Sequence, residues 1–80
     1  MDDEEIARRL AVRLRELRLR AGLTQAEVSR RTGMNRPNIA RLEAVRSRAS
    51  VPRLDTLLRY AEALGVQPSA VLGVLDETPV

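Results

Sequence analysis

Residues 24–43 constrain the fold of this chain more than any other segment, because they encode two short helices separated by a tight turn. Thr24 can accept hydrogen bonds from the first helical turn, while the side chain of Glu27 can reach back to the amide of Thr24 in a capping box. We therefore expect a helix to begin at about Gln25. Gly33 can adopt the positive φ that other residues resist, so this helix should end just before it.

A second helix is predicted to follow at once. Asn35 is its N-cap candidate, and Pro37 falls in the first turn, where a missing N–H costs nothing. A helix, a turn that contains glycine and a second helix form the outline of the DNA-binding helix-turn-helix, whose second helix enters the major groove. If Ile39 and Leu42 face inward, the exposed residues of the second helix are Arg36, Pro37, Asn38, Ala40 and Arg41. Arginine suits guanine, asparagine suits adenine and small apolar groups suit the thymine methyl, so these five residues are the candidate base contacts.

The wider pattern around the helix pair resembles the Cro/cI-type (XRE-family) domain of phage repressors and bacterial regulators. The resemblance extends from about Leu14 to Leu72 through G-L-T-Q, the helix pair, I-A-R-L-E and P-x-L-x-T-L-x-x-x-A-x-A-L-G-V. It implies an all-α, compact five-helix, lambda-repressor-like fold. We expect one domain over residues 1–80, with its core at about 6–75, the helix-turn-helix at about 24–43 and a short tail at 76–80.

The resemblance also implies roles for residues outside the second helix of the pair. Arg18 and Glu43 match an ion pair that fixes the recognition helix against the first helix, and an exposed pair of this kind would contribute only about 0–1 kcal/mol. Gln25 matches a glutamine that reaches a DNA phosphate beside the amides of a helix N-terminus. Asn35 is a second candidate phosphate contact, and its side chain could instead cap the helix that follows it.

The loop after the recognition helix departs from the family pattern. It is longer than usual, and Val45 stands where the family usually has glycine, so either the helix runs on by a turn or the loop is mobile. Arg46 and Arg48 in this loop still suit backbone phosphates beside the groove.

Apolar residues at helical spacing predict the scaffold. A first helix, ending at Gly22, carries Ile6, Leu10, Leu14, Leu17 and Ala21. The helix pair adds the core residues Leu23, Val28, Met34, Ile39 and Leu42. A fourth helix, opening near Pro52 and ending at Gly65, carries Leu54, Leu57, Leu58, Ala61 and Leu64. Ser29 stands where the family usually has alanine, and its hydroxyl therefore needs a backbone carbonyl.

A short fifth helix is expected after Gln67. Its aliphatic residues leave two interpretations open, a two-fold dimer interface or completion of the monomer core, and they are Val71, Leu72, Val74 and Leu75.

Composition excludes several functional classes. The chain has no Cys and no His, which removes thiol chemistry, the commonest general base and the commonest metal ligands. We therefore expect no catalytic residues, no cofactor and no metal site. The N-terminus is acidic rather than basic and no apolar run approaches the ~18 residues of a membrane span, so we expect a cytoplasmic protein with no membrane partner.

These observations favour a sequence-specific binder of double-stranded DNA, most simply a homodimeric repressor that reads an inverted repeat. Two alternatives stay open. The motifs I-A-R-L-E-A and T-L-x-x-x-A-x-A-L-G also resemble antitoxins that neutralise small ribonuclease toxins and repress their own operon, although no segment outside the domain has the pattern of a toxin-binding arm. A controller protein of a restriction–modification system has the same size and domain.

Overall fold

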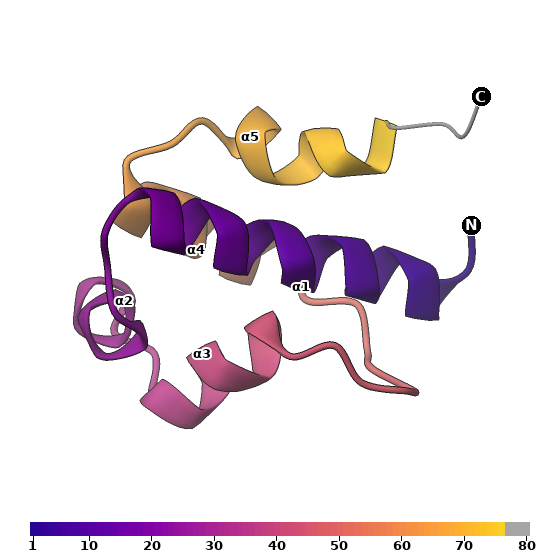
Figure 1. Cartoon of the computed structure of the whole chain (residues 1–80), viewed down its shortest axis with the longest axis horizontal. Coiled ribbons are helices and arrows are strands. Elements are labelled where there is room, and N and C mark those ends of the chain that lie inside the picture. Colours follow the sequence, from indigo (N-terminus) through magenta and orange to yellow (C-terminus); the bar gives the residue numbers. More distant parts are fainter. Residues whose placement is uncertain (77–80) are drawn as a thin grey trace.

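A computed structural model describes residues 1–76 as an all-helical protein (Figure 1). The elements are α1 (Asp3–Arg20), α2 (Gln25–Thr32), α3 (Arg36–Glu43), α4 (Leu54–Leu64), α5 (Pro68–Leu72) and the 3-10 helix η1 (Gly73–Asp76). No strand occurs among the described residues, so the prediction of an all-α, five-helix fold is confirmed.

Local capping determines the ends of the helix pair, as the sequence predicted. The side chain of Thr24 accepts a hydrogen bond from the amide of Glu27 at 3.1 Å, and the carboxylate of Glu27 accepts one from the amide of Thr24 at 3.1 Å. Gly33 ends α2 with a φ of 75°. Asn35 caps α3 through its side-chain oxygen, which accepts from the amide of Asn38 at 3.0 Å.

Helix α1 runs through the middle of the molecule, with α2 and α3 on one side of it and α5 on the other (Figure 1). Helix α3 packs against α1 and α2, while α4 packs against α2 and α5. The fully buried large side chains come from all five α-helices and are Leu10, Leu14, Val28, Ile39, Tyr60 and Val71. Leu23, Met34 and Leu42 are partly buried against this core, as the sequence suggested. Ser29 donates its hydroxyl to the carbonyl of Met34 at 2.6 Å, which satisfies the polar group.

Two of the predicted apolar stripes differ from the structure. Helix α1 ends at Arg20, and Ala21, expected to face the core, caps the helix and is exposed. In α4 the buried face is formed by Leu57, Tyr60, Ala61, Ala63 and Leu64. Leu54 and Leu58 were predicted to belong to this face but are exposed, because α4 is rotated so that Tyr60 faces α1. The predicted stripe contained only aliphatic residues and therefore omitted Tyr60, which is buried on the inner face of α4.

The C-terminal residues complete the monomer. Of the two interpretations left open for Val71, its burial contradicts the dimer interface and agrees with completion of the monomer core, because α5 packs against α4 and α1. Leu72, Val74 and Leu75 are partly buried against the same core. Asp76, assigned to the tail, is the last residue of η1, and the rest of the predicted tail lies outside the described residues.

Within residues 1–76, no helix combines the length and the apolar character that crossing a bilayer requires.

Candidate nucleic-acid interface

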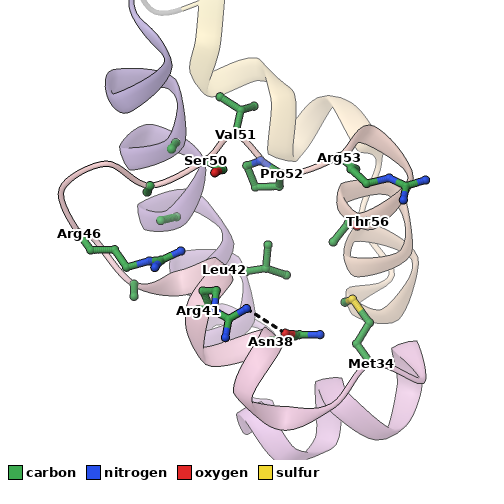
Figure 2. Close-up of a pocket in the computed structure, with 14 residues that line it drawn as sticks. Met34, Asn38, Arg41, Leu42, Arg46, Ser50, Val51, Pro52, Arg53 and Thr56 are labelled. Atoms are coloured by element: carbon green, nitrogen blue, oxygen red, sulfur yellow. Dashed lines mark hydrogen bonds between the residues drawn. The ribbon is translucent and has the colours of Figure 1, made fainter.

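Helix α3 turns a narrow apolar face inward and a polar face outward. Ile39 is fully buried, Leu42 is partly buried and the carboxylate of Glu43 is buried at the helix end. All five candidate base contacts are exposed, namely Arg36, Pro37, Asn38, Ala40 and Arg41. A guanidinium N–H of Arg41 donates to the side-chain oxygen of Asn38 at 3.5 Å, a long and readily exchanged contact (Figure 2). The exposed face can therefore present two arginines and one amide to a ligand.

A buried polar network holds this helix in place. The Nε of Arg18 donates to both carboxylate oxygens of Glu43, at 3.0 and 2.8 Å, and its Nη1 donates to the carbonyl of Leu23 at 2.9 Å. The hydroxyl of Tyr60 donates to Glu43 Oε2. The amide of Gln25 donates to Glu43 Oε1 at 3.4 Å. Side chains from α1, α2, α3 and α4 thus meet at one carboxylate.

The Arg18–Glu43 ion pair implied by the family resemblance is present, but it is not on the surface. Only 10% of the Arg18 side chain and 2% of the Glu43 side chain are exposed. The hydrogen bonds to Glu43 raise the pKa of Arg18, with burial opposing them. Burial, followed by hydrogen bonding to Glu43, raises the pKa of Tyr60 far above that of a free tyrosine. The network therefore contains a permanently charged arginine and a neutral phenol.

Sequence reasoning missed Tyr60, although a signal was present. Tyr60 is the single aromatic residue of the chain, and it lies one helical turn from both Leu57 and Leu64 on the α4 face that packs inward. A buried tyrosine hydroxyl needs a hydrogen-bond partner. Glu43 is the only acid in the recognition helix and the loop that follows it, residues 36–53.

Two of the candidate phosphate contacts already have partners within the chain. Asn35 uses its side-chain oxygen to cap α3. Gln25 lies half-buried in the first turn of α2, where its amide has the weak 3.4 Å contact with Glu43. Both stand at helix N-termini, where backbone amides and the helix dipole favour anions.

The loop after α3 is extended rather than helical. Helix α3 ends at Glu43, and Ala44 has a φ of −84° and a ψ of 131°, so the helix does not run on. Arg48 takes a positive φ of 59° at the turn of the loop. Arg46 and Arg48 are exposed. Segment 36–53 carries five arginines, Arg36, Arg41, Arg46, Arg48 and Arg53, and its single acid is the buried, paired Glu43. This part of the molecule is suited to an anionic ligand.

A groove of about 640 Å³ lies between α1, α3, the loop and the start of α4 (Figure 2). Arg41, Arg46 and Arg53 line it together with apolar side chains. Among residues 1–76, no group of three or more acidic side chains is arranged to hold a metal ion.

The chain is similar to a known domain family and to named bacterial proteins. The family model of a helix-turn-helix domain matches residues 9–72. The chain is 41% identical over 81 aligned residues to antitoxin HigA1 of Mycobacterium tuberculosis, in both strain CDC 1551 and strain H37Rv. That alignment covers 99% of this chain and 52% of HigA1, so the chain spans about half the length of these relatives. It is also 40% identical over 63 residues to y4dJ of Sinorhizobium fredii, named as an uncharacterized HTH-type transcriptional regulator, with 79% of this chain and 78% of y4dJ aligned.

Proposed function

This chain belongs to the helix-turn-helix domain family, and from that premise we propose that it is a sequence-specific DNA-binding transcriptional regulator, acting as a homodimeric repressor. The observation that carries the proposal is the exposed polar face of α3. The opposite side of this helix is fixed by the buried ion pair of Glu43 with Arg18. Fixing a recognition helix by its inward face leaves its outward face free to enter the major groove at a defined angle.

The proposed base contacts are the exposed residues of α3. Arg36 and Arg41 have the donor geometry for guanine, and Asn38 has the paired donor and acceptor for adenine. Pro37 and Ala40 present small apolar surfaces for a thymine methyl.

The proposed phosphate contacts lie on either side of that face. Gln25 and Asn35 stand at the N-termini of α2 and α3, where their side-chain amides can donate to a phosphate together with backbone N–H groups. Arg46 and Arg48 extend the interface along the loop.

A second candidate, an antitoxin role, is supported by the 41% identity to HigA1 along nearly the whole chain. The two functions are compatible, since an antitoxin that represses its own operon also binds DNA. Co-expression with the protein encoded by the adjacent gene tests this candidate. If that protein stops cell growth and this chain restores it, the antitoxin role is supported. If that protein does not affect growth, the role is refuted.

Selection of random duplex DNA by the purified protein at about 150 mM salt, followed by sequencing, tests the main proposal. We expect an enriched inverted repeat with half-sites about 10–10.5 bp apart, centre to centre. Retention of DNA without sequence enrichment, lost as salt increases, would refute sequence-specific regulation by this chain alone.

A further inference from the structure

The groove beside α3 contains apolar residues that the proposed DNA contacts do not account for. Its exposed arginines, Arg41, Arg46 and Arg53, form a basic rim. Its interior is lined by apolar side chains, Ala7, Ala11, Met34, Leu42, Val51 and Pro52, together with the polar side chains of Asn38, Ser50 and Thr56. We call it the arginine-rimmed groove. We propose that it binds an acidic segment of a partner protein, which inserts an apolar side chain into the groove and places carboxylates on the rim.

The size of the groove follows from its walls. Ala7 and Ala11 line it from α1, and both are buried, so small side chains form this part of its wall. The loop passes over this space instead of filling it, with Ser50, Val51 and Pro52 along its edge (Figure 2). The resulting volume of about 640 Å³ is in the range of sites that enclose several side chains or a small ligand.

Charge selects the partner. Every charged residue that lines the groove is an arginine, and the guanidiniums come from α3, the loop and the N-cap of α4. Arg53 contacts Asp55 at 3.0 Å, but both side chains are largely exposed, so this pair exchanges readily with an incoming carboxylate. Three arginines around an apolar interior therefore favour a segment that alternates acidic and apolar residues over a basic or purely apolar one.

The apolar interior favours a protein over duplex DNA. A sugar–phosphate backbone can lie along the rim, but it has no apolar side chain to insert between Leu42, Val51 and Pro52. A peptide segment satisfies both parts of the groove. Arg41 and Arg46 are also proposed DNA contacts, so partner and operator should exclude each other; this exclusion rests on the proposed function, whereas partner binding does not.

The test uses a displayed library of random peptides, selected on the full chain. Each round includes counter-selection on the variant Val51→Asp, which places a carboxylate inside the groove. We expect enriched peptides in which acids flank a large apolar residue. Resynthesised and fluorescently labelled, they should bind Val51→Asp at least about tenfold more weakly, and Arg53→Ser about two- to fivefold more weakly.

Matched controls lie outside the groove. Val12 on α1 is 47% exposed and Val51 is 38% exposed, so Val12→Asp adds the same charge at a similar exposure without lining the groove. Arg59→Ser removes an exposed arginine of α4 that lies elsewhere. Both controls should bind the peptides as the unchanged protein does.

Several outcomes would overturn the proposal. Recovery of no peptide that distinguishes the protein from Val51→Asp, or enrichment of peptides without acids, would show that the groove is not such a site. Equal weakening by Val12→Asp would point to a general charge effect. If Val51→Asp and Arg53→Ser instead weaken duplex binding and no peptide is selected, the groove is part of the DNA interface. Failure of the chain to select any DNA sequence would refute the proposed function while leaving the peptide result to stand alone.

Discussion

Replacing Arg18 by Met gives the sharpest test of how the recognition helix is held. The substitution keeps a long apolar stem against α1 and removes the guanidinium that donates to Glu43 at 2.8 Å and to the carbonyl of Leu23 at 2.9 Å. The carboxylate then stays buried with only the hydroxyl of Tyr60 and the long contact from Gln25. Two acceptors lose their principal donor, the buried carboxylate of Glu43 and the partly buried carbonyl of Leu23.

The expected loss of stability is large for a chain of this size. Removing one partner of a buried ion pair typically costs about 3–5 kcal/mol, because the remaining charge is uncompensated. A domain of 80 residues has a total free energy of unfolding of roughly 4–12 kcal/mol. With a urea dependence of about 1–1.5 kcal/mol per M, the unfolding midpoint should fall by roughly 2–5 M, or the variant should be unfolded at room temperature.

Urea unfolding followed by circular dichroism measures this effect, and Arg20→Met is the matched control. Arg20 is on the same helix and contacts Glu16 at 3.4 Å, but 69% of the Arg20 side chain and 41% of the Glu16 side chain are exposed. Its loss should therefore cost less than about 1 kcal/mol. Equal and small effects of the two substitutions would refute the argument that burial makes the Arg18 pair different.

A triple replacement, Arg18→Met with Glu43→Leu and Tyr60→Phe, extends the test. It removes the charge, its counterion and the hydroxyl that donates to it, so no charge is left buried without a partner. The partly buried carbonyl of Leu23 still loses the donor from Arg18. Apolar replacement of a whole buried pair is often neutral or stabilising, and we expect the triple variant to regain most of the lost stability. A triple variant as unstable as Arg18→Met would show that the damage is steric rather than electrostatic.

Three further predictions concern the Tyr60 hydroxyl, the proposed DNA contacts and the exposed face of α4. Because the pKa of Tyr60 is higher in the folded than in the unfolded state, stability should be intact below about pH 10 and fall above it by up to ~1.4 kcal/mol per pH unit, as measured by urea unfolding; Tyr60→Phe should remove this slope, and a slope that persists would assign it elsewhere. Arg41→Ala should relax base preference at one position of each half-site by ~1–3 kcal/mol in a sequencing selection, whereas Gln25→Ala should weaken all sites alike; the reverse pattern would exchange their roles. Leu54 and Leu58 lie one turn apart on the exposed face of α4, and if this face forms the dimer, Leu58→Glu should give a monomer in sedimentation experiments and Val12→Glu should not.

Local sequence was sufficient to predict the helix pair. The capping box of Thr24 and Glu27, the left-handed Gly33 and the cap by Asn35 each depend on residues within one turn of chain, so no tertiary information was needed. The exposed face of α3 followed in the same way once the buried position of Ile39 was assumed.

Features that depend on distant contacts were less predictable. The rotation of α4, which exposes Leu54 and Leu58, is determined by how Tyr60 fits between α1 and Glu43. The burial of Val71 depends on the contact of α5 with α1, far away in sequence. The groove is lined by residues of α1, α3, the loop and α4, which are far apart in sequence. None of these follows from the periodicity of one segment, because periodicity identifies a face and not what covers it.

The network around Glu43 contains strong and weak contacts, and their distribution relates the fold to DNA binding. Arg18 and Tyr60 come from α1 and α4, are buried and bind the carboxylate closely, so they fix the end of α3. Gln25 comes from α2, and its 3.4 Å contact lies beyond the usual range of an N–H···O bond. A phosphate at the N-terminus of α2 can therefore take the Gln25 amide while the contacts that fix α3 stay intact. The side chain proposed to meet the DNA backbone is thus the one whose release disturbs the recognition helix least.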